Sequence, residues 1–332
     1  MRLGSDRGRP SRNRTAHRCT TDRVNRVRPL VEAGGRRWRP AIGAQVVGVL
    51  GGDVARFSPV LAALEIAHTG SLMVDDVEDG AVVRRGRPAA HTVHGVATAL
   101  NAGTNAYFAV DRALQQCVPD DARLQGRMRE LFMEALRAVH AGQALDIQGH
   151  WEEMDRAVAL GEGAGLLEVV RLTHRLKSGA MVGACFEMAA LFTGAGLPLR
   201  RALAAFGSAY QISDDVADLH GVTRHGQSTR RVAEDLHNGK ITMPVAHSVH
   251  LLPPTELDAL WQALRTGSAS LPEVERAREA IRECGAPEAC EEEARMVVEE
   301  AWRRLRPLLP DTPAADHIYD RARACIDSNL IT

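Results

Sequence analysis

Apolar residues recur at helical spacing through nearly every long segment after about residue 23. Alanine, leucine, glutamate and arginine dominate these segments, and alternating β-branched runs are few. Glycine and proline interrupt the pattern often enough to leave room for about ten helices. At 332 residues and 45% hydrophobic content, the chain can bury a large core. We therefore expect an all-α protein without strands.

Charge and cysteine content limit the classes of function and the cellular compartment that we expect. The formal net charge is −1, so no global basic field favours nucleic acid, and any attraction for anions must come from local clusters. The six cysteines show no CxxC spacing and no secretory segment precedes them, which favours unlinked thiols in a reducing cytoplasm. Residues 1–22 are rich in arginine and poor in apolar side chains, so we expect a disordered arm followed by one domain over 23–332.

The most membrane-like run is residues 180–196, "AMVGACFEMAALFTGAG". It is shorter than the roughly 20 apolar residues that span a bilayer, and Glu187 stands near its centre. We expect a buried helix here and no transmembrane segment.

Two acidic clusters point to a metal site. In "SLMVDDVEDG", Asp75 and Asp79 have the i, i+4 spacing that places both carboxylates on one helix face. "AYQISDDVADL" repeats this spacing with Asp214 and Asp218, again after an apolar run. Carboxylates stacked in this way repel, and as hard oxygen ligands they favour Mg²⁺, which usually keeps water and phosphate oxygens in its coordination shell. The expected ligand is a diphosphate, although a single motif of this type is often only a solvated helix face.

Basic residues suited to a diphosphate occur in four short motifs, "GGRRWRP", "RRGRP", "LKSGA" and "NGKITMP". Of the 41 basic residues counted as Lys or Arg, only Lys177 and Lys240 are lysine. In so arginine-rich a chain, a lysine suggests a position that needs a compact ammonium group rather than a planar guanidinium.

These motifs, together with "GQALDI" and their order along residues 34–250, resemble the isoprenyl diphosphate synthases. Within that family, "NAGTNAYFAV" and "LRAVHAGQALDIQGHW" are most similar to geranylgeranyl diphosphate synthases of the eukaryotic type. The resemblance implies a single-domain prenyl synthase-type helical bundle around a central substrate cavity. It implies a Mg²⁺-dependent prenyltransferase that condenses isopentenyl diphosphate with dimethylallyl, geranyl or farnesyl diphosphate, most often to geranylgeranyl diphosphate.

The resemblance also assigns roles to residues. With about three Mg²⁺ ions bridging the allylic diphosphate, the implied metal ligands are Asp75, Asp79 and Asp214, supported by Asp76 and Asp218. The implied diphosphate-binding side chains opposite the metal are Arg84, Lys177 and Lys240. Isopentenyl diphosphate would be held without metal by Arg36, Arg39, His68 and Arg85. Ser178 and Gln211 would direct oxygen dipoles at the allylic cation. The family usually has lysine at the position of Arg36 and threonine at that of Ser178.

Product length is expected to depend on side-chain bulk beneath the metals. Gly70 and Ser71 lie five and four residues before Asp75, about 6 to 7.5 Å along the helix. Both are small, so a growing tail should pass this level. The residues matching the floor of the eukaryotic-type synthases are Tyr107, Phe108 and His140, whose bulk would stop a C20 chain unless they are ordinary core residues. Family members are usually homodimers, and residues 98–116 could pack against a second copy.

Three alternatives use the same residues. A terpene cyclase on this fold would also ionise a prenyl diphosphate, but it would have no use for Arg36, Arg39 and Arg85 together. A di-iron bundle could use the Glu-x-x-His spacing of "EIAH" (65–68) and "EDLH" (234–237), but would leave both acidic clusters unexplained. An inactive partner subunit of a heteromeric synthase would not need intact acidic motifs.

Overall fold

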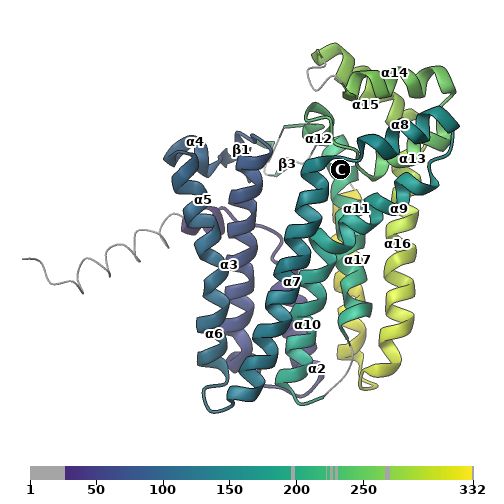
Figure 1. The fold of residues 1–332 in the computed structure, drawn as a ribbon. Coiled ribbons are helices and arrows are strands. Elements are labelled where there is room, and N and C mark those ends of the chain that lie inside the picture. Colours follow the sequence, from purple (N-terminus) through teal and green to yellow (C-terminus); the bar gives the residue numbers. More distant parts are fainter. Residues whose placement is uncertain are drawn as a thin grey trace, which may run out of the picture. The chain divides into compact units, whose positions relative to one another are not determined.

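The computed structural model describes residues 27–195, 199–221, 223–224, 227–228, 231–265 and 270–330, and these are largely helical (Figure 1). The predicted all-α class is therefore confirmed. The predicted arm at residues 1–22 lies outside the described residues. Five cysteines fall within the described part, and all five are free thiols, as expected: Cys117, Cys185, Cys284, Cys290 and Cys325.

The chain divides into two compact units, which we describe separately. Unit 1 comprises residues 1–35 and 66–109, and unit 2 comprises residues 36–65 and 110–332. Helix α3 (Val54–Glu78) starts in unit 2 and ends in unit 1. The further elements of unit 1 are β1 (Val83–Arg84), β2 (Arg87–Pro88), α4 (Ala90–His94), α5 (Val96–Asn105) and the 3₁₀ turn η1 (Ala106–Phe108).

Unit 2 contains the remaining elements. They are α2 (Trp38–Val49), α6 (Ala109–Cys117, whose first residue belongs to unit 1), α7 (Ala122–Gln148), α8 (Trp151–Leu160), α9 (Ala164–His174), the π-helical segment η2 (Arg175–Gly179), α10 (Ala180–Phe192), α11 (Arg200–His220), β3 (Thr223–Arg224), β4 (Gln227–Ser228), α12 (Glu234–His237), α13 (Met243–Leu251), α14 (Pro254–Arg265), α15 (Leu271–Glu283), α16 (Ala286–Leu305), the 3₁₀ turn η3 (Arg306–Leu308) and α17 (Pro313–Leu330).

The expectation of no strands is wrong in detail. Strands β1 and β2 pair antiparallel, with Arg84 opposite Arg87, and β3 pairs with β4 in the same way. The turn between β1 and β2 consists of Arg85 and Gly86, which both have positive φ (55° and 71°), as a two-residue type I′ hairpin requires. Each strand has only two residues, too few to produce an alternating pattern in the sequence.

Unit 1 has a small core in which α3 crosses α5. Met73 of α3 is buried with Ala102 and Ala106. At the crossing, a Cβ on Gly70 would lie 2.4 Å from the carbonyl oxygen of Gly103. The two backbones approach closely because glycine stands on both helices.

The core of unit 2 is built around α11, which packs against α10, α16 and α17 (Figure 1). Helix α10 is apolar around most of its circumference, as a helix surrounded by others must be. The predicted buried helix in 180–196 is thus confirmed for α10. The carboxylate of Glu187, which interrupts that apolar run, accepts a hydrogen bond from the backbone N–H of Arg200 (3.0 Å) at the start of α11. Its charge therefore satisfies an otherwise orphaned donor at a helix N-terminus.

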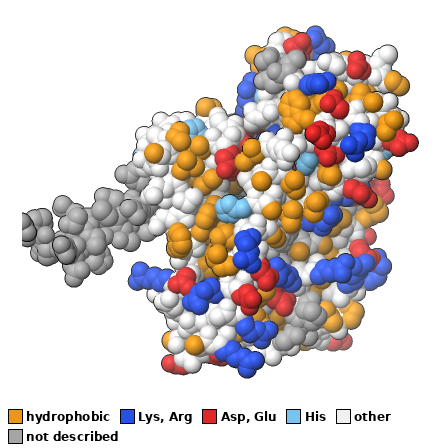
Figure 2. Space-filling view, in the orientation of Figure 1, with side chains coloured by type: hydrophobic (Ala, Val, Ile, Leu, Met, Phe, Trp, Pro, Cys, Tyr) orange, Lys and Arg blue, Asp and Glu red, His pale blue; other side chains and the backbone are white. Residues whose placement is uncertain are grey.

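Among the described helices, α3 is the one whose length and apolar composition would allow it to cross a membrane. Half of the apolar stretch is buried inside the structure. Core helices of globular proteins have the same properties, so this stretch does not by itself indicate a membrane span. Acidic and basic side chains are interspersed over the face seen in Figure 2, in keeping with the net charge of −1.

Candidate active site

The first acidic motif ends α3 in unit 1. The backbone N–H of Asp79 donates to the carbonyl of Asp75 (2.8 Å), so the helical turn continues and the two residues have the predicted stacked spacing. Arg84 on β1 donates from Nε to Oδ1 of the buried Asp76 (2.5 Å) and from Nη2 to Oδ2 of Asp75 (3.2 Å). The hairpin thus supplies a cation that offsets the repulsion between these carboxylates.

Arg84 and Arg85 are neighbours in sequence but have different partners. Arg85 has a left-handed backbone conformation, and its Nη1 donates a hydrogen bond to the carbonyl of Leu30 (2.8 Å). His68, one of the predicted isopentenyl diphosphate ligands, lies on α3 in this unit, where its carbonyl accepts a hydrogen bond from the Ser71 hydroxyl (2.8 Å). Arg85 and His68 therefore share unit 1, whereas Arg36 and Arg39 belong to unit 2.

The two lysines meet on one carboxylate in unit 2. Lys177 lies in the π-helical segment, and Lys240 follows α12. Both ammonium groups donate to Oδ2 of Asp146, Lys177 from 2.7 Å and Lys240 from 3.1 Å. Burial alone would raise the pKa of Asp146, but the two lysines outweigh this effect and hold that pKa below its ordinary value. Asp146 is therefore an anion shared by both lysines.

The backbone explains why Lys177 can reach α7. A Cβ on Gly142, one turn before Asp146, would lie 2.5 Å from the backbone nitrogen of Lys177. Only glycine allows this close approach between α7 and the π segment. π-helical segments are rare and occur frequently at functional sites. The sequence motif "GQALDI" contains both Gly142 and Asp146, but nothing in it indicated that Asp146 binds the two lysines.

The second acidic motif lies on α11, also in unit 2. Asp214 is half-buried, and Asp218 is buried and accepts a hydrogen bond at Oδ2 from the backbone N–H of Asp235 (3.1 Å). Ala233 adopts a left-handed φ of 52° and donates its N–H to the carbonyl of Asp218 (2.9 Å). One turn before Asp214, Gln211 accepts a hydrogen bond from Ser178 of the π segment (2.7 Å). The structure therefore brings together the predicted pair Ser178 and Gln211.

The predicted isopentenyl diphosphate ligands of unit 2 have protein partners that the sequence did not indicate. Arg36 donates from Nη1 to the carbonyl of Cys325 (2.7 Å) and from Nη2 to that of Ser328 (3.0 Å), both on α17. The guanidinium of Arg39 lies over the rings of Trp38 (4.8 Å) and Tyr210 (5.6 Å). Helix α17 therefore holds Arg36, whereas Arg39 packs against α2 and α11.

The predicted chain-length residues are placed in several environments. The small size of Gly70 is required by its contact with α5, so it is not evidence for a passage at that level. Tyr107 is half-buried, and burial followed by the charges of Glu78 and Asp75 raises its pKa to about 12. The side chains of Phe108 (75% exposed) and His140 are exposed in the single chain. The role of these two residues as the floor that stops a C20 chain stays a prediction.

The acidic motifs have the donor chemistry that Mg²⁺ requires, namely carboxylate oxygens on helix ends. In the described part of the chain, no three His, Cys, Asp or Glu side chains gather into a group that could enclose a metal ion. This is compatible with Mg²⁺, which typically takes one or two carboxylates from the protein and fills its octahedron with water and substrate phosphate. The residues therefore fit a metal that arrives with a diphosphate.

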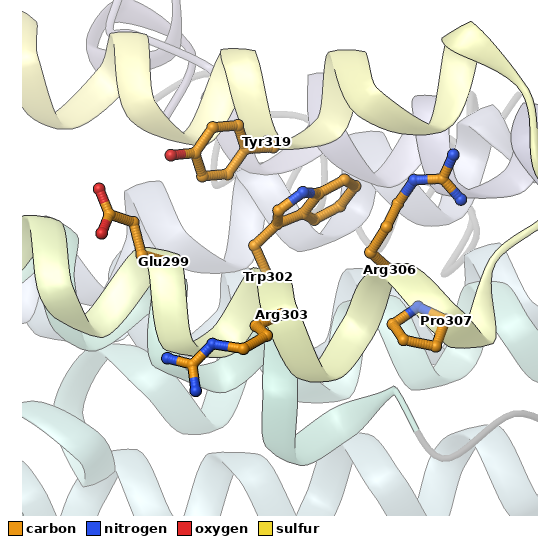
Figure 3. Close-up of a pocket in the computed structure, with 6 residues that line it drawn as sticks. All are labelled: Glu299, Trp302, Arg303, Arg306, Pro307 and Tyr319. Atoms are coloured by element: carbon orange, nitrogen blue, oxygen red, sulfur yellow. The ribbon is translucent and has the colours of Figure 1, made fainter.

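A hollow of about 430 Å³ occurs elsewhere in unit 2, between α16 and α17 (Figure 3). Trp302 and Tyr319 stack there with ring centroids 5.5 Å apart. Arg306 also lines it, but this side chain forms ion pairs with Asp311 (2.7 Å) and Asp316 (2.8 Å). None of the lining residues belongs to the acidic or lysine motifs, so we do not assign the substrate to this hollow.

Comparisons with known proteins identify the family of this chain. A profile of the polyprenyl synthetase family matches residues 24–281. The geranylfarnesyl diphosphate synthase of Aeropyrum pernix is 32% identical over 86% of this chain and 86% of that protein. The farnesyl diphosphate synthase of Geobacillus stearothermophilus is 34% identical over 66% of this chain and 73% of that protein. Other relatives are named geranylgeranyl pyrophosphate synthases and come from fungi and from the archaeon Geoglobus acetivorans.

Among solved structures, a polyprenyl synthase from Caulobacter crescentus, complexed with calcium and isoprenyl diphosphate, aligns with a TM-score of 0.77 at 26% identity. The alignment covers 93% of this chain and 92% of that one. The fold is therefore that of the isoprenyl diphosphate synthases, a class of prenyltransferases that condense isopentenyl diphosphate with an allylic diphosphate. The chain belongs to the polyprenyl synthetase family. This membership leaves the di-iron alternative without support.

Proposed function

We propose that this prenyltransferase makes geranylgeranyl diphosphate, the product named for several of its relatives. The observation that supports prenyl transfer is the junction in unit 2, where the π segment presents Lys177 and Ser178 beside Asp146 and Gln211; the C20 length rests on the names of these relatives. Relatives that bear the names of farnesyl and geranylfarnesyl synthases make C15 and C25 the competing outcomes. The motifs that resemble eukaryotic-type synthases support C20 among these.

In this proposal, Asp75, Asp79 and Asp214 hold Mg²⁺, with Asp76 and Asp218 as supports. Bound Mg²⁺ would supply positive charge that stabilises the departing diphosphate. Arg84, Lys177 and Lys240 bind the same diphosphate from the protein side. All three are already ion-paired with Asp75, Asp76 or Asp146, so the protein holds its cations in place before substrate arrives. Charge that is positioned in advance needs no reorganisation during the reaction.

The reaction then proceeds on the substrates themselves. The allylic C–O bond breaks, its electron pair leaves with the diphosphate, and an allylic cation remains. The double bond of isopentenyl diphosphate, held by Arg36, Arg39, His68 and Arg85, donates its electrons to form the new C–C bond. Ser178 and Gln211 direct oxygen dipoles at the positive charge. The released diphosphate accepts the proton that is lost at the end, so the protein needs no dedicated base.

The test is an elongation assay with Mg²⁺, labelled isopentenyl diphosphate and each allylic starter in turn, with chain length measured after phosphatase treatment. We expect C20 as the main product. A main product of C15 or C25 would refute the proposed chain length while leaving the prenyltransferase intact. A cyclised hydrocarbon formed without isopentenyl diphosphate would instead support the terpene cyclase alternative.

We further propose a cytoplasmic homodimer. Phe108, at 75% exposure, lies in the segment 98–116, where a large apolar side chain would be covered by a second copy. Light scattering should give twice the chain mass of 36.0 kDa at micromolar concentration, and Phe108→Asp should shift the protein toward monomer. A wild-type monomer would refute the dimer. The free thiols support a reducing compartment, which cell fractionation can test.

A further inference from the structure

Asp215, which stands between the two predicted metal-binding residues of α11, has its carboxylate turned into the core of unit 2. The residue is 5% exposed. Its Oδ1 accepts a hydrogen bond from Nε2 of Gln211 (3.2 Å). Its Oδ2 lies 3.0 Å from the backbone nitrogen of Met243 and 3.2 Å from Nε2 of His174. Asp215 is therefore surrounded by three nitrogen atoms from α9, α11 and α13.

These contacts impose a direction on a chain of hydrogen bonds. A backbone N–H can only donate, so the atom of residue 215 facing Met243 must be an acceptor. Because the carboxylate accepts on both oxygens, the Gln211 amide turns its NH₂ group toward Asp215 and its Oε1 toward Ser178. The Ser178 hydroxyl donates to that Oε1 across 2.7 Å, which uses its only hydrogen. The remaining lone pairs of Ser178 and Gln211 are then the groups available to a neighbouring cation.

We propose that Asp215 is a positioning residue that sets this direction, so that Ser178 and Gln211 present lone pairs rather than N–H or O–H groups to the allylic cation. The proposal rests on the proposed function, in which these two side chains face the cation. Asp215 itself does not touch substrate. Preorganised dipoles are effective because they already point the right way when charge develops, and reversing them would oppose the cation instead of stabilising it.

Asp215→Asn tests the proposal with almost no change in size. Two donors, the N–H of Met243 and Nε2 of His174, keep the Asn oxygen on their side, so the Asn NH₂ group faces Gln211. The Gln211 amide must then turn over to offer its oxygen, which leaves its NH₂ group facing Ser178 and forces the hydroxyl hydrogen outward. We expect kcat to fall about a hundredfold, with KM for both diphosphates and the Mg²⁺ dependence within about twofold of wild type.

Exchanging the carboxylate and the amide between positions 215 and 211 should restore the direction of the hydrogen bonds. In the double variant Asp215→Asn/Gln211→Glu, the carboxylate at position 211 accepts from both the Asn NH₂ group and the Ser178 hydroxyl. We expect it to recover about tenfold or more of the lost kcat. The matched control is Glu293→Gln, which neutralises another buried carboxylate of unit 2. Its partners, Arg171 and His247, lie one helical turn from His174 and Met243 and outside the hydrogen-bond chain of Ser178 and Gln211. This control should lower stability and leave kcat near wild type.

Several outcomes would overturn the proposal. They are a wild-type kcat in Asp215→Asn, a double variant no faster than the single one, and a loss that appears as an altered Mg²⁺ dependence, which would make Asp215 a metal-binding residue. A loss of kcat equal to that of Glu293→Gln at similar melting temperature would reduce the effect to general destabilisation. Failure of the proposed function is distinguishable, because the wild-type protein would then form no elongated product.

Discussion

Glu293 offers a quantitative test of how unit 2 holds charge in its core. This side chain on α16 accepts two hydrogen bonds from Arg171, Nε to Oε1 (2.6 Å) and Nη2 to Oε2 (2.8 Å). Nε2 of His247 lies 2.9 Å from Oε2. Burial would raise the pKa of Glu293, but the bonds and charges of these two partners prevail and lower it to about 2. The carboxylate is thus stabilised strongly in its ionised form.

The magnitude follows from linkage. The gap between the ordinary value of 4.5 and the folded pKa of about 2 corresponds to about 3 kcal/mol of stability at neutral pH. Because the Arg171 side chain is 38% exposed, solvent screening reduces the expected contribution to about 2 kcal/mol. We therefore expect Glu293→Gln to lower the free energy of unfolding by about 2 kcal/mol at pH 7.

The contribution of Glu293 to stability should decrease as the pH falls. The folded pKa lies below the unfolded one, so the contribution is complete above pH 4.5 and is lost as the pH falls toward 2. Urea unfolding of both proteins at pH 7 and at pH 3.5 should show that roughly half of the difference between them disappears at the lower pH. Equal unfolding free energies at pH 7, or a difference that does not change with pH, would refute this account of the Glu293 cluster.

Three other predictions concern single positions. Gly70→Ala should lower the free energy of unfolding by about 1 to 3 kcal/mol, since its Cβ would meet the Gly103 carbonyl at 2.4 Å; an unchanged urea midpoint would disprove the tight crossing. Lys240→Arg should reduce kcat although it keeps the charge, because a planar guanidinium cannot replace an ammonium group on Asp146; a wild-type rate would make the lysine dispensable. Asp75→Ala should lower turnover by about two to three orders of magnitude with the circular dichroism spectrum unchanged, and EDTA should abolish wild-type activity; full activity in EDTA would contradict a metal role.

Much of the fold could be predicted because apolar spacing reports directly on helices. The same periodicity correctly predicted that Asp75 and Asp79 stack on one face, since that depends only on residues four apart. The buried character of α10 was also visible, because a helix without a polar stripe must be surrounded. Two-residue strands could not be predicted, because two residues make a single period of the alternation and show no repeat.

The hydrogen-bond and ion-pair partners of the site residues could mostly not be predicted from the sequence, because they depend on contacts between distant segments. Asp146 is 31 residues from Lys177 and 94 from Lys240, so no local pattern links the three. The π-helical turn at 175–179 could not be predicted either, since one extra residue per turn leaves the amino-acid composition unchanged. Asp215 and Asp214 are adjacent and identical in type, and only the packing of α11 against α9 and α13 shows that Asp215 is buried while Asp214 is half-buried.

The attachment of Arg36 to α17 has a consequence for the order in which the protein matures during synthesis. Arg36 and its acceptor Cys325 are separated by 289 residues. At translation rates of 5–20 residues per second, the acceptor is made about 15 to 60 s after the arginine. The same helix end reaches α11, where Asn329 donates to Ser213 (2.8 Å), next to Asp214. In a nascent chain, Arg36 and Ser213 can therefore form these contacts only after α17 has left the ribosome.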